Sequence, residues 1–514
     1  MKKKKRLLAT LTALMLVFST VSGCGSNSVN ESQDSTGNQT ASSTENSASE
    51  ERPTVTWCAV GTETDTSDRV SAAATQLLND AGINVNFEIR WYSWSNYAQQ
   101  ITNMIATGEE FDLFNYDISS INNYAVSGGV YEISDEDLEQ YLGDAVSAMT
   151  EEIVDKCRYN GSLYAIPVAH EFAQWRGVYY NVGIAEEYGI DMSQVKSVED
   201  LDAVFATLKE KAPDIIPLDS LNSENILLVM ADQDDVNRNS SLCLGMDVSD
   251  EDGEVFNIWE NEKVINALRK IREWNEAGYI LTDTTLDYTS MFQTEGKIFC
   301  HIARMKPGTV EQYSTGGQTF DYILFDDNAI QTFCDFPGGW GVGVSGTSSD
   351  PQAAMQVLNF AYSSKDFIDL LTFGEKDVDY TVDEEGIVTI NETGYGADEY
   401  SNASWQMGNH YINSITSAQV ATGQSDIWER LKEFNETALS LPQTGFWFNS
   451  SDFSSEVTAI TNTYNEYADS LLMGEVDVDE TLAEFNAALE ANGIQSLIDE
   501  ANRQYQEFLS SKTE

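Results

Sequence analysis

Basic side chains are scarce in this sequence. Its 514 residues include 28 Lys and Arg against 84 Asp and Glu, which gives a formal net charge of −56. Nucleic acids and anionic membrane surfaces are bound through positive groups that release counterions, so this composition argues against both as partners. High charge also fits a disordered chain, but 10 Trp, 23 Tyr and 22 Phe indicate a packed core instead. We therefore expect a large, acidic, folded protein.

Patterns that bind metals or cofactors are also missing. The chain has only 3 histidines, which stand far apart, and no HExxH, Cys/His cluster or EF-hand spacing occurs. Gly341, Gly343 and Gly346 spell GxGxxG, yet the next helix is expected to begin only at Pro351. In a dinucleotide site the helix begins within the glycines. The sequence therefore predicts no metal site and no cofactor.

No catalytic motif stands out. Nucleophile-elbow spacing is absent, and nothing singles out the two opposed carboxylates that a glycosidase needs. We expect no enzyme activity, and a cell-surface glycosidase stays open as an alternative because a chain with 84 acidic residues can contain such a pair without a motif.

Cysteines are few and scattered. After Cys24 there are five, an odd number without CxxC spacing, at positions 58, 157, 243, 300 and 334. A chain of this length builds its own core and needs no disulfide framework. We expect free thiols, with bridging of one pair left open.

Long hydrophobic runs are absent beyond the N-terminus. Residues 2–6 are basic, residues 7–18 are apolar apart from two threonines, and small residues follow up to Cys24. This pattern predicts a secretory signal over residues 1–23. The junction resembles a bacterial lipobox, which implies that Cys24 becomes a lipid-modified N-terminus. The alternative is an ordinary cleaved signal with an incidental cysteine.

The segment after the signal predicts a tether. Residues 24–52 begin with Cys24 and continue with Ser, Asn, Thr, Glu and Gln, which offer too little apolar surface to fold. No later window holds about 18 uninterrupted apolar residues, so we expect the rest of the chain to lie outside the membrane.

From residue 54 the pattern alternates between strands and helices. Period-2 stretches at 55–59, 85–91 and 111–114 predict strands, and period-3.6 stretches at 70–78 and 95–107 predict helices between them. Such alternation implies right-handed crossovers and a parallel sheet whose ligands lie at the carboxyl ends of the strands.

The alternation resumes after residue 176. Strands are expected at 178–180, 298–302 and 340–344, and helices at 197–211, 260–277 and from Pro351 onward. Residues 374–400 are acidic and predict an exposed excursion, whereas the chain from 452 is mostly helical. Trp57, Trp274 and Trp428 lie on strand or helix faces and are expected in the core. Two α/β lobes, with the chain crossing between them more than once, account for this order.

Several segments follow one another in a recognisable order. They are 110–114 (EFDLF) with 122–130 (NNYAVSGGV), 159–167 (YNGSLYAIP), 179–181 (YYN) with 186–190 (EEYGI), 340–345 (WGVGVS), and 445–448 (GFWF) with 464–467 (YNEY). Together they resemble the extracellular solute-binding proteins of bacterial ABC importers, in particular the carbohydrate-type group called family 1. The last two resemble the C-terminal helical domain of a Gram-positive lipoprotein subgroup.

The resemblance implies a two-lobed, periplasmic-binding-protein-like (type II) α/β fold with a hinge and extra C-terminal helices. The first lobe would contain residues 53–173 and 340–372, and the second residues 174–339 and 373–514. The lobes of such proteins close over a ligand and perform no chemistry on it. The expected protein is a monomeric receptor, anchored through Cys24 on the extracellular face of the membrane, that delivers a carbohydrate or oligosaccharide to ABC permease subunits.

Ligand contacts are expected where strands end and where the chain crosses between lobes. Planar polar groups suit sugar hydroxyls, and aromatic rings suit the apolar faces of sugars. Glu171 and Arg304 follow from the resemblance, and the other candidates follow from the expected loops and crossovers: Glu63, Tyr92, Trp94, Asn115, Tyr116, Asp117, Trp175, Trp340 and Trp405. A receptor for a peptide or another polar small molecule remains the alternative within the class, and an adhesin remains an alternative outside it.

Overall fold

The computed structural model describes residues 52–149, 151–219, 221–223, 225–248, 253–281, 286–331, 340–397 and 404–512. The expected signal, the lipidated Cys24 and the tether up to residue 51 lie outside these ranges, as does Cys334.

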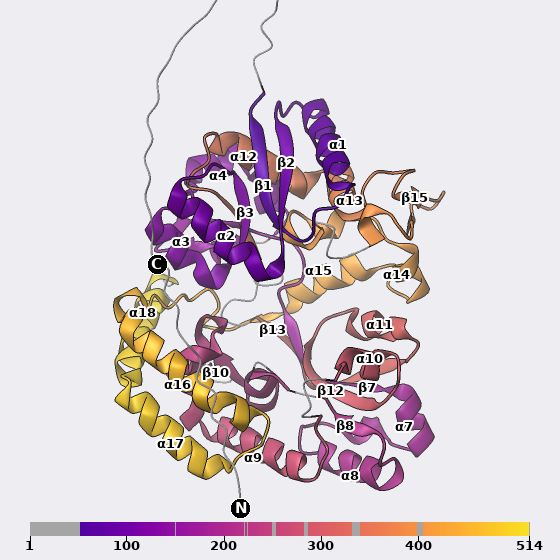
Figure 1. The fold of residues 1–514 in the computed structure, drawn as a ribbon, viewed down its shortest axis with the longest axis vertical. Coiled ribbons are helices and arrows are strands. Elements are labelled where there is room, and N and C mark those ends of the chain that lie inside the picture. Colours follow the sequence, from indigo (N-terminus) through magenta and orange to yellow (C-terminus); the bar gives the residue numbers. More distant parts are fainter. Residues whose placement is uncertain are drawn as a thin grey trace, which may run out of the picture. The chain divides into compact units, whose positions relative to one another are not determined.

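Two five-stranded sheets organise the part of the chain from residue 52 onward (Figure 1). The first has the strand order β2-β1-β3-β14-β6. Strands β1, β2 and β3 are parallel, which confirms the predicted arrangement, whereas β14 runs antiparallel to both of its neighbours. The strands of this first sheet are β1 (Thr54–Val60), β2 (Asn86–Tyr92), β3 (Leu113–Asp117), β6 (Ile166–Pro167) and β14 (Trp340–Val344).

Helices accompany the first sheet in the predicted alternation. Helix α1 packs against β2 and α13, and α12 packs against β1 and β14. The boundary at Pro351 is confirmed: Pro351 stands in the first turn of α12, and the Asp350 side chain accepts a hydrogen bond from Ala353 N–H at 3.0 Å. The helices are α1 (Ser67–Asp80), α2 (Trp94–Thr107), α3 (Ile121–Ser127), α4 (Asp135–Tyr141), α5 (Gly143–Ser147), α6 (Glu151–Asp155), α12 (Pro351–Ser363) and α13 (Lys365–Phe373).

The glycines that spell GxGxxG allow close packing. A Cβ on Gly343 would stand 2.7 Å from Tyr116 Cε1, and one on Gly346 would stand 2.0 Å from the Gly128 carbonyl oxygen. These glycines therefore let β14 and the turn after it approach the neighbouring backbone and rings.

Two strands are longer than predicted. The third strand was expected at 111–114, but β3 extends to Asp117 because β14 pairs with it along its whole length. Asn115, Tyr116 and Asp117 therefore lie within a strand and not in the loop after it, so that expectation was wrong. Arg304 likewise lies inside β12 (Ile298–Met305), because β7 pairs with that strand as far as Met305.

The second sheet has the order β17-β13-β7-β12-β8. Strand β7 runs antiparallel to both β12 and β13, and β8 pairs with β12 only around residues 298–300. Its other strands are β7 (Gln174–Asn181), β8 (Ile216–Leu218), β13 (Phe320–Gln331) and β17 (Leu439–Ser440). Its helices are α7 (Val182–Tyr188), α8 (Leu201–Lys211), α9 (Glu262–Glu276), α10 (Tyr288–Gln293), α11 (Thr309–Tyr313) and α15 (Ile427–Thr437).

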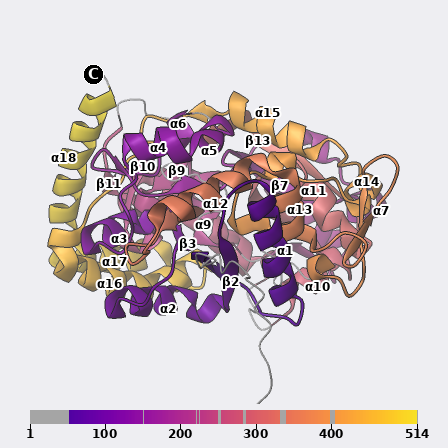
Figure 2. The same cartoon turned by 90° about the horizontal axis from the view of Figure 1, so that it is seen from above.

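The C-terminal part is helical, as predicted. Helices α16 (Ser454–Leu472), α17 (Val478–Ala491) and α18 (Ile494–Lys512) lie together at one side of the view in Figure 2. They share a hydrophobic cluster with α9 and a small antiparallel sheet of β9 (Gln233–Asp235), β10 (Leu244–Asp247) and β11 (Phe256–Asn257).

Trp447 connects this C-terminal cluster to the core of the first sheet. Its ring packs against both hydrophobic clusters. Its Nε1 donates to the Lys156 carbonyl oxygen at 3.0 Å, while the backbone of Phe448 exchanges two hydrogen bonds with the side chain of Asn237, at 3.0 and 2.8 Å. One short segment is therefore bound on both sides.

The expected exposed excursion is only partly exposed. It contains a hairpin of β15 (Tyr380–Val382) and β16 (Val388–Ile390), and Tyr380 and Val388 are buried against Phe373. Helix α14 (Ser417–Ala421) follows later in the chain. The prediction failed here because the apolar residues that fold the hairpin are few and widely spaced in an acidic segment.

Two of the three tryptophans expected in the core are buried there, Trp57 and Trp274, whereas Trp428 is half-buried. Four cysteines, Cys58, Cys157, Cys243 and Cys300, are buried and free. Within the described ranges, no helix is both long and apolar enough to cross a membrane.

Candidate functional site

Three tryptophans from distant parts of the sequence meet at the carboxyl edge of the parallel strands. Trp94 begins α2, Trp340 begins β14, and Trp405 lies in a turn after the hairpin. The Trp94 and Trp405 rings are stacked at 5.4 Å with 9° between their planes, and Trp340 meets both rings edge-on at 5.4 and 5.5 Å. We call these residues the tryptophan triad.

Buried polar groups next to the triad fix the position of its residues. The side chain of Gln406 accepts from Val60 N–H and donates to Val60 O, both at 2.7 Å, which fixes the residue after Trp405 at the end of β1. Asn115 donates to the Gln406 carbonyl oxygen and accepts from Trp57 Nε1. The Tyr97 ring packs against Trp340 at 5.8 Å, and Tyr92 meets Tyr97 edge-on at 6.4 Å.

The triad offers aromatic surface to solvent. Trp94 is 54% exposed, although large aromatic side chains are normally buried in a folded core. Flat rings held rigidly in this way suit a ligand that has apolar faces and a polar rim.

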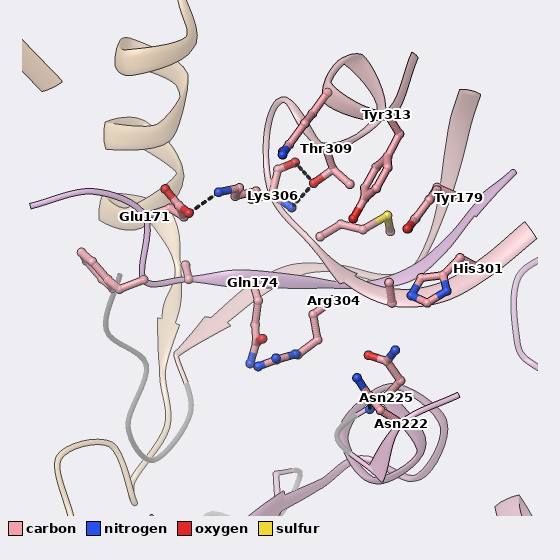
Figure 3. Close-up of a pocket in the computed structure, with 15 residues that line it drawn as sticks. Glu171, Gln174, Tyr179, Asn222, Asn225, His301, Arg304, Lys306, Thr309 and Tyr313 are labelled. Carbon is pink, nitrogen blue, oxygen red and sulfur yellow. Dashed lines mark hydrogen bonds and ion pairs between the residues drawn. The ribbon is translucent and has the colours of Figure 1, made fainter. Parts of the chain in front are cut away.

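A polar cavity of about 370 Å³ opens beside β7 and β12. Figure 3 places Glu171 and Lys306 at one end, and His301 with Asn222 and Asn225 at the other. Most of its lining side chains donate or accept hydrogen bonds. The lining residues are Glu171, Phe172, Ala173, Gln174, Tyr179, Asn222, Asn225, His301, Ala303, Arg304, Met305, Lys306, Thr309, Gln312 and Tyr313.

Glu171 is the charged centre of one end of this cavity. Its Oε2 lies 3.0 Å from His170 Nδ1, and its Oε1 accepts from Lys306 Nζ. Burial alone would raise the pKa of Glu171, but these two neighbours hold it well below its ordinary value. The ion pair also ties the segment before β7 to the turn after β12.

One segment runs from the tryptophan triad to the cavity. After Trp405 and Gln406, the backbone at Gly408 and His410 exchanges hydrogen bonds with Ala169, both at 2.9 Å. The Tyr411 hydroxyl then donates to the His170 carbonyl oxygen at 2.5 Å. Hydrogen bonds therefore join the segment that carries Trp405 to the segment that carries Glu171.

The candidates from the sequence are distributed over several places. Trp94, Trp340 and Trp405 meet in the triad, with Tyr92 near it, and Glu171 and Arg304 line the cavity. Glu63 and Asp117 are exposed at the ends of β1 and β3.

The remaining candidates have structural partners. Asn115 and Tyr116 are buried, and Tyr116 OH donates to the Tyr164 carbonyl oxygen. Trp175 stands opposite Met305 on the paired strand, and its ring stacks on Tyr322 at 5.9 Å; it is not among the residues that line the cavity. A role in ligand binding stays a prediction for every candidate.

Several lining residues carry no signal in the sequence. Asn222 and Asn225 lie in a region without clear periodicity, and His301 stands far from the other histidines in the sequence. Tyr179 belongs to the YYN strand motif, and period-2 alternation along that strand indicates that its ring and the ring of Tyr180 point to opposite faces.

Two family models match the chain. The model described as "Bacterial extracellular solute-binding protein" matches residues 72–374, more than half of the chain, and one described as "Domain of unknown function (DUF3502)" matches residues 442–510. A curated relative from Streptococcus pneumoniae serotype 4, named carbohydrate ABC transporter substrate-binding protein, is 25% identical over 491 residues, which cover 93% of this chain and 95% of the relative.

Solved structures share the fold. The N-glycan transport solute binding protein (NgtS) of S. pneumoniae superposes with a TM-score of 0.76 at 23% identity, over 90% of this chain and 100% of the other. The same protein with bound Man5GlcNAc gives 0.66, and an HMO-binding solute-binding protein of Bifidobacterium longum infantis gives 0.63 at 16% identity, each over about nine-tenths of this chain.

Proposed function

Since this chain belongs to the bacterial extracellular solute-binding protein family, we propose that it captures a carbohydrate, most simply an oligosaccharide, and delivers it to an ABC importer. The observation that carries the choice of ligand class is the tryptophan triad, whose rigid and partly exposed rings suit the apolar faces of sugar rings. The relatives named for carbohydrate, N-glycan and HMO binding support the same choice.

The proposed site combines the triad with the polar cavity. Trp94, Trp340 and Trp405 contact sugar faces, while Glu171, Arg304 and the neighbouring amides of the cavity meet hydroxyl groups. Each hydrogen bond to a charged group contributes about 1.5–3 kcal/mol. Capture needs no chemistry on the ligand, which leaves unaltered.

We also propose that capture proceeds by closure of two lobes about a hinge. The segment that would bend leads from β6 of the first sheet into β7 of the second. The lobe boundaries stay as predicted from the sequence, at 173/174, 339/340 and 372/373. A ligand stabilises the closed form only to the extent that it binds that form more tightly than the open one.

The location follows from the N-terminal pattern and the family. We propose that the protein is exported, that Cys24 carries the lipid anchor after residues 1–23 are removed, and that the monomer works with permease subunits at the extracellular face of the membrane. Substitution of Cys24 by Ala should abolish incorporation of labelled palmitate and release the protein into the medium. Retention of the variant in the membrane fraction would contradict the anchor.

Binding to a defined glycan panel tests the function. Man1GlcNAc, Man5GlcNAc, HMO glycans and alginate oligosaccharides are titrated by calorimetry and thermal shift, with peptides of similar mass as a second set. A raised melting temperature and recovery of the intact glycan are expected. Release of a cleaved product would establish a glycosidase, binding only to peptides would establish a peptide receptor, and binding only to polymers or surfaces would establish an adhesin.

A further inference from the structure

The side chains of His301 and Asp219 form a hydrogen-bonded pair behind the wall of the polar cavity. His301 stands on β12, and Asp219 directly follows the neighbouring strand β8. The Nδ1 of His301 is bound to Oδ2 of Asp219, which is only 2% exposed. The other carboxylate oxygen, Oδ1, is buried and has no hydrogen-bond partner among the described residues.

This pairing determines which ring nitrogen carries a proton. An ionised carboxylate accepts hydrogen bonds and cannot donate them, so Asp219 favours the imidazole form that has its proton on Nδ1. In the neutral ring, Nε2 is then a hydrogen-bond acceptor. No described residue makes a hydrogen bond to Nε2, and the ring belongs to the lining of the cavity.

The surroundings hold the ring in one orientation. Strand pairing sets His301 opposite Tyr179, whose ring lies 5.1 Å away, and Tyr179 is itself stacked on Tyr313 at 4.9 Å. Below the ring, Asn225 is 5% exposed, and its side-chain amide makes no hydrogen bond to a described residue (Figure 3). A fixed acceptor and a buried amide therefore face the same end of the cavity.

We infer that His301 is a specificity-determining contact for the captured glycan and that Asp219 is its positioning residue. Nε2 accepts a hydrogen bond from a ligand O–H group, and the Asn225 amide meets the same or the next hydroxyl. The ligand must therefore present a donor at this end of the cavity. Directly opposite Nε2, an ether oxygen, an O-methyl group or a carboxylate binds more weakly than a hydroxyl, since two acceptors cannot form a hydrogen bond. This inference rests on the proposed carbohydrate function and deepens it.

The protonation state is measurable without any ligand. Because the chain has only 3 histidines, nitrogen NMR of protein labelled in histidine resolves each ring, and the signals are assigned by single substitution. In its neutral form the ring of His301 should carry its proton on Nδ1. In Asp219→Asn, whose amide both donates and accepts, the two tautomers should mix. A proton on Nε2 in the wild type, or an unchanged spectrum in Asp219→Asn, would overturn the positioning role.

Two variants test the ligand contact. His301→Asn retains an N–H donor near the place of Nδ1 but has no atom where Nε2 stands, and it should weaken binding of Man5GlcNAc, or of the best-binding panel glycan, by about tenfold or more. Asp219→Asn should weaken binding less. Asp202→Asn is the control, because Asp202 also accepts from a ring N–H, that of Trp274 at 2.6 Å, but lies outside the cavity lining.

The outcomes separate this inference from the function it rests on. If no panel glycan binds the wild type, the proposed function fails, and the NMR result alone decides whether Asp219 sets the tautomer. If a glycan binds the wild type and His301→Asn equally well, the function stands and the contact is refuted. A melting temperature of His301→Asn close to that of the wild type shows that weaker binding does not come from misfolding.

Discussion

The side chain of Asn435 on α15 holds the backbone of Phe172: its Oδ1 accepts from the Phe172 N–H at 3.0 Å. The Nδ2 of the same amide donates to the His170 carbonyl oxygen at 2.9 Å. One buried amide thus fixes the segment that carries Glu171 and leads into β7. The positions of Glu171 and of the first residues of β7 depend on it.

Asn435→Ala should destabilise the fold, because it leaves the partly buried Phe172 N–H without its acceptor and removes one of the two hydrogen bonds that the His170 carbonyl oxygen accepts. The expected loss is about 1–3 kcal/mol of unfolding free energy. Denaturant unfolding measures it, with Asn103→Ala on the exposed face of α2 as the matched control. Equal stability of the two variants would show that the backbone at residues 170–172 finds other partners.

Trp94→Ala should weaken glycan binding without loss of stability. The ring is 54% exposed, so its removal costs little core packing, whereas loss of a stacking surface should reduce affinity by about tenfold. Calorimetry with the best panel glycan measures the effect. Tyr288→Ala is the control, since Tyr288 is an aromatic residue of similar exposure, 51%, outside the triad. Equal affinity in both variants would remove Trp94 from the site.

Glu171→Gln should reduce stability in a pH-dependent way. The folded pKa of Glu171 lies well below the unfolded value of about 4.3, so its charge stabilises the fold above that pH. This contribution is lost as the pH falls through the folded pKa. The unfolding free energy of Glu171→Gln should therefore be about 1–3 kcal/mol lower than that of the wild type at neutral pH, and the gap should shrink below about pH 4.

Denaturant unfolding at neutral and acidic pH measures this gap. The exposed Glu139→Gln on α4 serves as the control and should show little difference from the wild type at either pH. A gap for Glu171→Gln that stays constant with pH would mean that shape, and not charge, explains the loss.

Gly343→Ala should destabilise the first sheet. The added Cβ would stand 2.7 Å from Tyr116 Cε1 and 2.9 Å from Val130 Cγ2, closer than packed atoms tolerate. Overpacking of this kind costs about 1–3 kcal/mol. Gly143→Ala is the control, because nothing lies within 4 Å of its Cβ. Thermal unfolding compares the two, and equal melting temperatures would mean that β14 shifts without cost.

Local periodicity predicted much of the fold. The parallel strands β1, β2 and β3, the helices between them, the start at Pro351 and the helical C-terminus all depend on short-range patterns that the structure confirms. The ends of the strands are harder to predict from local patterns. The final residues of β3 and β12 are determined by partners more than one hundred residues away, and no local pattern around Asp117 or Arg304 records that pairing.

The site was predicted only in part for the same reason. The sequence predicts Trp94, Trp340 and Trp405 separately, from loops or crossovers, but it does not show that Gln406 binds Val60 and so brings Trp405 to the other two. Trp175 shows that closeness in the sequence does not ensure a place in the same site. It follows Glu171 closely in the chain, yet its ring packs against Tyr322 and Phe434 and does not line the cavity.

The double attachment of Trp447 has a consequence for how the protein can be divided. The solute-binding family match ends at residue 374, and the DUF3502 match begins at 442, which invites expression of the first part alone. Such a shortened chain would leave a hole where the indole sits and would lose the hydrogen bond from Trp447 Nε1 to the Lys156 carbonyl oxygen. The C-terminal segment thus supports the core of the first sheet, and its removal would destabilise the part of the chain that carries that sheet.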